Sequence, residues 1–214
     1  MPDKRDMNAA WRYRRILGYV VFAALAPLAA CRDPRQGYQP TVGDVLFQSL
    51  PHSPLVDAIE GATGSPFSHC GIIVRHDRRW FVLEAIGPVK ETPLNAWIGR
   101  GRLRGFAAFR FKPKYRARVG EVIQEAEKYR GRRYDIHYRF DNDEIYCSEL
   151  IFVAFKKVFG EDLGTVRKLG DLNWGPYAGV IFQIEGSYPT SREMITPVDL
   201  SRAPQLSEIC RVNL

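Results

Sequence analysis

Cys147 is the residue of this sequence best placed to act as a nucleophile. It lies in the segment IYCSEL, residues 145–150, directly before an apolar run with helical periodicity that ends at Gly160. A cysteine in the first turn of a helix lies beside free backbone N–H groups and the positive end of the helix dipole, and both stabilise a thiolate. The same N–H groups can bind the oxyanion of an acyl-transfer reaction. Cys147 is therefore a candidate nucleophile, set against the common alternative of a small buried core residue.

A thiol nucleophile needs a base, and His69 is the best candidate. Residues 68–85 read as two strands joined by a turn, which we place at residues 76 and 77. The numbers of opposed residues then sum to 153, so His69 faces Glu84. Opposed side chains of an antiparallel pair share one face, with Cβ atoms about 4.5–5.5 Å apart. Glu84 is therefore expected to hold one imidazole nitrogen of His69 while the other nitrogen meets the thiol.

Other interpretations of these residues stay open on the sequence alone. His69 could be a core histidine bonded to a backbone carbonyl, and Glu84 could be a surface residue at a strand end. A register slip of one residue would separate the two side chains. His137, ten residues before the cysteine, is a rival base in a polar loop. Cys70 is expected to point to the face opposite His69.

The first 31 residues have the features of a bacterial lipoprotein signal. Arg12, Arg14 and Arg15 precede an apolar run, residues 16–30, that is too short for a comfortable membrane span. The run ends in LAAC, which fits a lipobox with Cys31 as the lipidated first residue of the mature chain. An ordinary secretory signal or an uncleaved anchor is the alternative.

We therefore expect a signal peptide over residues 1–30, a lipidated tether over residues 31–40 and one domain over residues 41–214. Residue 32 is Arg rather than the Asp that often retains bacterial lipoproteins at the inner membrane. The expected location is the cell envelope, on the periplasmic face of the outer membrane, where a lipid anchor makes the membrane a partner.

Composition excludes several classes of protein. The chain has 214 residues, 45% of them hydrophobic, enough for one sizeable core. Its formal charge of +7 is spread over short basic stretches, so no nucleic-acid partner is expected. There are four cysteines, four histidines and no CxxC, so a closed structural zinc site is not expected. Cys70 and Cys210 are either free thiols or a disulfide, and the sequence does not indicate an oligomeric state.

Hydrophobic periodicity and the positions of glycine and proline predict the secondary structure. Strands are expected within residues 43–50, 65–74, 78–87 and 106–113, and helices within residues 53–64, 92–101, 115–130 and 147–159. Residues 131–146 form a polar loop, and the last fifty residues read as irregular with one strand at 179–186.

Five segments, taken in order, resemble the YiiX/YebB-like permuted papain-type amidases, which are related to NlpC-like cell-wall peptidases. The segments are GDVLFQ, PFSHCGIIV, VLEAIGPVKETPL, YRGRRYDIHY and IYCSEL, within roughly residues 40–160. The resemblance implies a single α+β domain with a circularly permuted papain-like (NlpC-like) fold, an antiparallel sheet packed against helices. It also implies the order His, polar residue, Cys, which this chain has as His69, Glu84 and Cys147 in the roles of base, orienting carboxylate and nucleophile.

The same resemblance gives expectations for the neighbouring residues. Tyr134, Asp135 and Ser148 are assigned to substrate binding or to the oxyanion. Tyr134 and Asp135 could instead be structural, as a packed loop tyrosine and a turn-capping aspartate. The family pattern has no histidine at position 137 and no second cysteine in SHCG, and the last fifty residues match it poorly.

The expected function is that of an envelope-anchored cysteine hydrolase, an amidase, esterase or acyltransferase, working through a covalent acyl-thioester without a metal or organic cofactor. Two substrates are considered, a lipid or fatty-acyl amide or ester, and a peptidoglycan stem peptide. An apolar pocket beside Cys147 would favour the first, and an open polar groove the second. A non-catalytic envelope binding protein on a degenerate papain-like scaffold is the alternative of a different class. A thiol redox protein is a third, disfavoured because no resolving cysteine lies near Cys147 in the sequence.

Overall fold

The computed structural model describes residues 37–140 and 142–214. The expected signal peptide, the lipidated Cys31 and most of the expected tether lie outside the described residues. Tyr38, within the expected tether, is buried against Phe106, and its hydroxyl donates to Asp44 Oδ2 at 2.9 Å. The packed part of the chain therefore includes residues before position 41.

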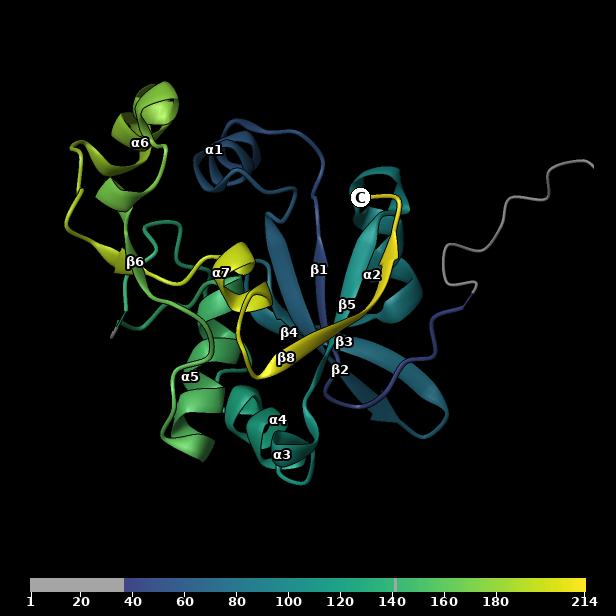
Figure 1. The fold of residues 1–214 in the computed structure, drawn as a ribbon. Helices are drawn as coiled ribbons and strands as arrows, with labels where there is room; N and C mark the ends of the chain where they lie inside the picture. Colours follow the sequence, from purple (N-terminus) through teal and green to yellow (C-terminus); the bar gives the residue numbers. More distant parts are fainter. Residues whose placement is uncertain (1–36, 141) are drawn as a thin grey trace, which may run out of the picture. The chain divides into compact units, whose positions relative to one another are not determined.

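The described residues form both helices and strands (Figure 1). The strands are β1 (Val45–Gln48), β2 (His69–His76), β3 (Arg79–Ala85), β4 (Val89–Pro93), β5 (Phe106–Phe111), β6 (Arg167–Lys168), β7 (Glu193–Met194) and β8 (Leu206–Val212). The α-helices are α1 (Pro54–Thr63), α2 (Leu94–Arg100), α3 (Pro113–Arg116), α4 (Val119–Glu127), α5 (Cys147–Phe159), α6 (Ala178–Glu185) and α7 (Pro197–Ser201). Short 3₁₀ turns are η1 (Arg102–Arg104), η2 (Leu169–Asp171) and η3 (Gly175–Tyr177).

A six-stranded antiparallel sheet in the order β4-β3-β2-β1-β5-β8 separates two apolar clusters. The larger cluster includes α4 and α5, and the smaller includes α2. Figure 1 shows α3, α4 and α5 on one side of the sheet and α2 on the other. Because successive residues of a strand point to opposite faces, β2 can present one side chain to α5 and the next to α2.

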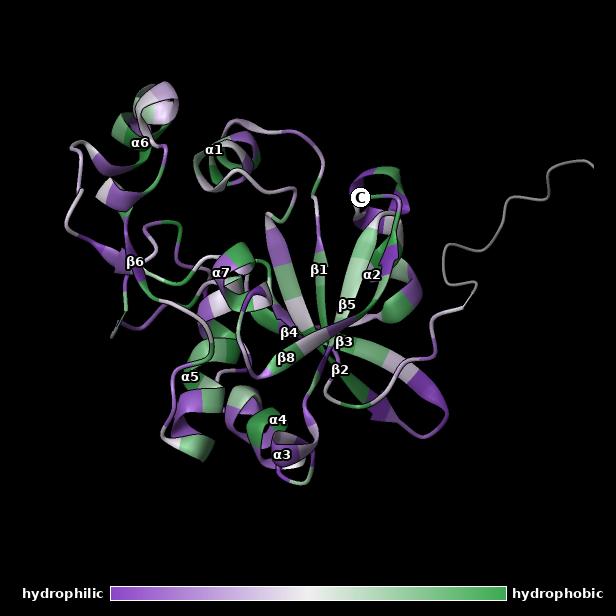
Figure 2. Cartoon of the chain, in the orientation of Figure 1, coloured by the Kyte–Doolittle hydropathy of each residue, from purple (hydrophilic) through white to green (hydrophobic). Residues whose placement is uncertain are grey.

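The β2–β3 hairpin has a register two residues away from the expected one. The numbers of paired residues sum to 155, as in Ile72 opposite Leu83, rather than 153, so the predicted turn is one residue too early. The turn lies beyond His76, where Asp77 takes a φ of 54° that a short polar residue tolerates. Since the error is two residues and not one, the alternation of faces is unchanged. Figure 2 shows the tip of this hairpin in hydrophilic colours.

The corrected register places Gly71 across from Glu84. A Cβ atom added at Gly71 would lie 3.2 Å from Glu84 Cβ and 2.4 Å from a methyl carbon of Val82. The missing side chain therefore leaves room for Glu84 to lean along the strand toward His69, its diagonal neighbour.

The C-terminal fifty residues are more regular than predicted. The segment expected as a strand at 179–186 is the helix α6, which ends at Gly186 with a φ of 68°. β8, which was not predicted, covers the β5 edge of the sheet, and α7 was also missed. The helix expected over residues 115–130 divides into α3 and α4. Within the described residues, no helix is long and apolar enough to cross a membrane.

Replacing Gly71 by alanine should destabilise the fold and loosen Glu84. The added methyl meets Val82 and Glu84, and overpacking of this kind costs roughly 1–3 kcal/mol. Gly120→Ala is the matched control, because no atom lies near its Cβ position and alanine favours a helix over glycine by about 1 kcal/mol. Urea unfolding of both variants checks the prediction, and equal stabilities would contradict it.

Candidate active site

Cys147 is the first residue of α5, as predicted from the sequence. The first bond within the helix runs from Leu150 N–H to Tyr146 O at 3.0 Å. The N–H groups of Cys147 and Ser148 precede that bond, so they have no acceptor inside the helix. The side chain of Glu149 turns back to accept from Tyr146 N–H at 3.3 Å, which fixes the start of the helix. The cysteine therefore lies where a helix stabilises a negative charge.

His69 and Glu84 are in direct contact, as expected for a base and its orienting carboxylate. His69 Nε2 lies 2.5 Å from Glu84 Oε2, and both side chains are buried. Trp97 of α2 packs beside the imidazole, with ring centroids 6.2 Å apart. Because Nε2 is engaged with the carboxylate, Nδ1 is the nitrogen left to meet a thiol.

Two residues that the sequence did not single out hold Glu84 in place. Thr92 Oγ1 donates to Glu84 Oε1 at 2.6 Å. Arg100 donates to both carboxylate oxygens, at 3.0 Å and 2.5 Å. The strand β4, which was not predicted, pairs Lys90 with Glu84 and places Thr92 as the next residue on the same face. No signal in the sequence existed for Arg100, which α2 brings back over the sheet.

The thiol of Cys147 is surrounded by groups that favour its charged form. A hydrogen bond from the Cys70 side chain is the largest influence and lowers the pKa of Cys147 well below its ordinary value, against the opposing effect of burial. A hydrogen bond and the charge of His69 lower the pKa of Cys147 further, as does the backbone N–H of Cys70. Cys147 is therefore held as a thiolate.

The pKa values of His69 and Glu84 are shifted in opposite directions, and each shift favours the charged form. Burial would lower the pKa of His69, but hydrogen bonds with Cys147 and Glu84 outweigh it and raise that pKa to about 9. Burial would raise the pKa of Glu84, but His69 and Arg100 outweigh it and lower that pKa to about 2. The directions of the three pKa shifts favour a thiolate–imidazolium pair supported by a carboxylate.

Tyr134 also reaches the nucleophile. Its hydroxyl lies 3.3 Å from the hydroxyl of Tyr138, and Cys147 is close enough to raise its pKa. Burial and the neighbouring Tyr138 and Cys147 raise the pKa of Tyr134, so it stays protonated and can donate. Tyr134, which was assigned to substrate binding or to the oxyanion, thus lies near the thiol of Cys147.

The other two assigned residues have different surroundings. Asp135 accepts from two backbone N–H groups of its own loop and from Asn142 Nδ2 at 2.7 Å, which matches the turn-capping alternative. The hydroxyl of Ser148 donates to Ile195 O at 2.7 Å. A role for Ser148 at the oxyanion would therefore use its backbone N–H and not its side chain.

The remaining candidates, His137, Cys210 and Cys70, lie in three different surroundings. His137, the rival base, lies beside Glu185, with 3.3 Å between Nδ1 and Oε1. Cys210 lies in β8 opposite Ala108, and both it and Cys70 are free thiols. Cys70, predicted to point away from His69, belongs to the larger apolar cluster under α5 and contacts Cys147 there.

A cleft leads to the site. His69 and Tyr134, which both contact Cys147, line it. Its walls include Leu55, Ile59 and Tyr138, which also line a second pocket, so the two meet there.

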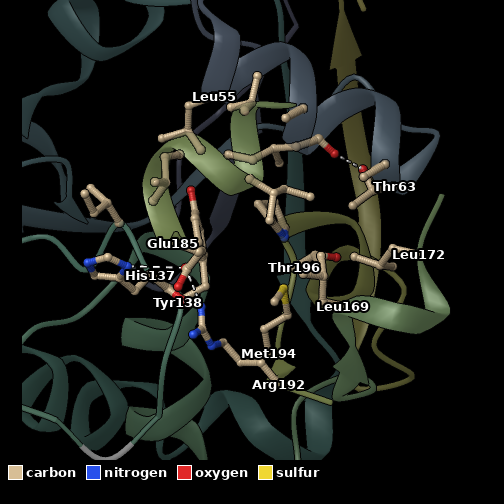
Figure 3. A pocket seen from close by; sticks show the side chains of 18 of the residues that line it. Leu55, Thr63, His137, Tyr138, Leu169, Leu172, Glu185, Arg192, Met194 and Thr196 are labelled. Atoms are coloured by element: carbon tan, nitrogen blue, oxygen red, sulfur yellow. Dashed lines mark hydrogen bonds and ion pairs between the residues drawn. The ribbon is translucent and has the colours of Figure 1, made fainter. Parts of the chain in front are cut away.

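The second pocket is mainly apolar. Figure 3 shows His137, Glu185 and Arg192 gathered on one side of it, with Leu169 and Leu172 on the other. Arg192 donates to Glu185 and, at 2.7 Å, to the carbonyl of His137. The charged side chains on this wall are thus paired with one another. The pocket is built largely by α1 and the C-terminal segment that the sequence left unassigned.

A model of the permuted papain-like amidase enzymes of the YaeF/YiiX type, the C92 family, matches residues 39–210. The chain belongs to this family. It is 30% identical over 182 residues to the uncharacterized protein YiiX of Escherichia coli K12, which covers 83% of this chain and 90% of that protein. A crystal structure described as metalloprotein yiiX from Escherichia coli O157:H7 superposes with a TM-score of 0.76 at 30% identity, covering 81% of this chain and 98% of that one.

Membership of the YaeF/YiiX family confirms three predictions from the sequence. The resemblance was to the right family, the fold is α+β with a permuted papain-like arrangement, and the protein is a thiol hydrolase. The family match itself does not name the residues of this chain that act, so their roles rest on the geometry described above.

Replacing Arg100 by methionine should make the site sensitive to acid. Glu84 stabilises the fold above its unfolded pKa of about 4.5, and that contribution is lost as pH falls through its folded pKa of about 2. Without Arg100 the folded pKa rises toward 4.5, and leaving a buried charged group short of a partner costs about 2 kcal/mol at neutral pH. Acid unfolding followed by circular dichroism should therefore begin at higher pH.

Arg211→Met provides the control for this experiment. Arg211 is paired with Glu208 on the surface, with 2.8 Å between the charged groups. Exposed pairs contribute at most about 1 kcal/mol, so its acid transition should match that of the unmodified protein. Equal acid transitions for Arg100→Met and Arg211→Met would show that Arg100 does not hold Glu84.

Proposed function

We propose that this protein is an envelope-anchored cysteine hydrolase that acts through a covalent acyl-thioester on a lipid amide or ester. The observation that carries the catalytic part is the buried chain of contacts from Arg100 through Glu84 and His69 to Cys147. The observation that favours a lipid is the apolar pocket that adjoins the catalytic cleft.

In the proposed reaction, the thiolate of Cys147 attacks the carbonyl carbon of the substrate. The oxyanion that forms is bound by N–H groups at the start of α5 and by the hydroxyl of Tyr134. The imidazolium of His69 gives its proton to the leaving amine or alcohol, and the acyl group stays on sulfur. His69 then takes a proton from water, or from another acceptor, which releases the acyl group and restores the thiolate. Glu84 holds the imidazole throughout.

The substrate side of the proposal depends on where the acyl group would lie. The cleft at His69 and the apolar pocket meet at Leu55 and Ile59, so an acyl chain bound to Cys147 can extend between them. Each methylene buried there stabilises the complex by about 0.8 kcal/mol. A chain of several carbons therefore gains affinity that a short acid does not.

A second candidate substrate is a peptidoglycan stem peptide. The charged group of His137, Glu185 and Arg192 on the pocket wall favours it, because such side chains can bind the carboxylates and amines of a peptide. Their pairing with one another leaves less charge for a ligand, which is why the lipid is preferred.

A metal ion does not enter this mechanism. The related crystal structure is described as a metalloprotein. Among residues 37–140 and 142–214 of this chain, no group of three or more His, Cys, Asp or Glu side chains is arranged to share a metal ion. Because the donor set does not fit, no step is derived through a metal.

The anchoring part of the proposal rests on the sequence of residues 16–31, which lie outside the described structure. Labelling cells with a radioactive or clickable fatty acid tests it, with Cys31→Ser as the control. Incorporation that persists in Cys31→Ser, or that never occurs, would contradict the assignment of Cys31.

Selective modification of Cys147 tests the proposed nucleophile. An electrophilic acyl probe should label Cys147 well below the pKa of about 8.5 that a free cysteine has, because the imidazolium of His69 stabilises the thiolate. In His69→Ala the labelling should shift toward the pH dependence of a free thiol, and in Cys147→Ala it should disappear. Intact mass measured across the pH range gives the result, and indifference to His69 would contradict the pair.

A series of nitrophenyl acyl esters of increasing chain length tests the substrate class. If the chain enters the apolar pocket, kcat/KM should rise roughly three- to fourfold per methylene until the pocket is full. Ala62→Phe places a ring among the residues that line the pocket and should remove this rise while leaving turnover of the acetyl ester unchanged.

Ala117→Phe is the matched control for that series, since Ala117 is exposed between α3 and α4. It should retain the full dependence on chain length. A flat dependence in the unmodified protein, together with cleavage of a stem-peptide amide, would replace the lipid with the cell-wall peptide.

A further inference from the structure

Cys70 is a buried thiol that the hydrolytic mechanism does not need as a reactant. It follows His69 in β2 and is fully buried, while Cys147 is nearly so. Both belong to the same apolar cluster and both are free thiols. Consecutive residues of a strand point to opposite faces. The side chains of His69 and Cys70 therefore approach the sulfur atom of Cys147 from two sides.

Two separate groups of Cys70 contact that sulfur. The side-chain thiol and the backbone N–H of Cys70 both lower the pKa of Cys147, and the two residues lie in the same buried cluster where α5 packs against β2. The backbone contact has a structural reason, because the ladder between β2 and β3 begins only at Ile72 and leaves the preceding part of β2 without a β3 partner. A disulfide between the two residues requires the sulfur atoms to come within about 2.05 Å of each other.

We propose that Cys70 is a resolving thiol, and that peroxide converts Cys147 and Cys70 into a disulfide that reversibly blocks the nucleophile. The proposal rests on the proposed role of Cys147 as a reactive thiolate. It concerns a modification of the site and not the turnover of a substrate.

The chemistry balances in two steps. The thiolate of Cys147 attacks one oxygen of hydrogen peroxide, the O–O bond breaks, and the departing hydroxide takes the proton of the His69 imidazolium to leave as water. Cys147 is then a sulfenic acid. The sulfur of Cys70 attacks the sulfur of Cys147, the S–O bond breaks, and the departing hydroxide takes the proton of Cys70 to leave as a second water. The two sulfurs lose two electrons, and peroxide gains them.

The order of the two steps follows from the surroundings of each sulfur. Cys147 lies beside the imidazolium of His69 and at the start of a helix, so it is the thiolate that reacts first with peroxide. Cys70 lies among apolar side chains and stays a thiol until the sulfenic acid forms beside it. Cys210 belongs to β8, where it packs against the smaller cluster on the other side of the sheet, so it is not placed to take part.

Mass spectrometry of the full chain, purified in mild detergent and treated with hydrogen peroxide, tests the proposal. The unmodified protein and Cys210→Ser should each lose about 2 Da, yield a cross-linked peptide joining Cys70 to Cys147, and regain thiol labelling of Cys147 after dithiothreitol. In Cys70→Ser, Cys147 should instead gain about 32 or 48 Da as sulfinic or sulfonic acid and should not recover.

Two results would overturn the inference. One is irreversible oxidation of Cys147 at the same rate with and without Cys70. The other is a disulfide that joins a different pair of cysteines. Neither result depends on a substrate, and the second does not depend on the folding of a variant, because the cross-link is measured in the unmodified chain. Labelling of reduced Cys147 by the acyl probe is recorded in parallel, so a failure of the proposed nucleophile is distinguished from a failure of the disulfide.

Discussion

The buried contact between His69 and Glu84 is the interaction on which the active site depends. Two ionisable side chains are removed from water there, which is costly unless each has further partners. Glu84 has them in Arg100 and Thr92, and His69 has one in Cys147. The charges alternate along this chain of contacts, so each buried group lies beside a group of opposite charge. A thiolate can persist at the end of the chain for that reason.

The sheet makes this arrangement possible because its two faces carry different groups of the site. Its α2 face carries Glu84 and the groups that hold it, and its other face carries α5 and the nucleophile. His69 is the first residue of β2, so its ring lies at the end of the strand, where a side chain from one face can meet a helix that covers the other. A histidine two residues further along β2 would be enclosed on the α2 side. Gly71 occupies that position, and its lack of a side chain gives the carboxylate room to reach the ring.

The C-terminal segment adds a different feature to the fold. α6 and the residues around β7 close over α1 and form the apolar pocket beside the catalytic cleft. α6 is mostly apolar, yet none of its residues is fully buried, and several of them line the pocket. The groups proposed to be catalytic lie in the sheet and α5, so the shape of this pocket can vary without disturbing them. The groups proposed for the reaction and the residues that shape the pocket therefore belong to different parts of the fold.

The sequence by itself was sufficient for the parts of the protein that depend on local pattern. The periodicity before Gly160 placed Cys147 at the start of a helix, and alternation along the hairpin put His69 and Glu84 on one face. That second inference survived an error of two residues in the register because the faces of a strand repeat every two residues. An error of one residue would have removed the pair.

Other features were decided only by tertiary structure, because they join segments that are distant in the chain. The run expected as a strand at 179–186 is the helix α6, because a short apolar run is compatible with either a strand or a helix. The strand at that edge of the sheet is β8 instead. The salt bridge of Arg100 and the contact of Cys70 with Cys147 arise from how α2 and α5 pack on the sheet. No spacing in the sequence reports a distance between packed elements, so these partners appeared only once the chain was folded.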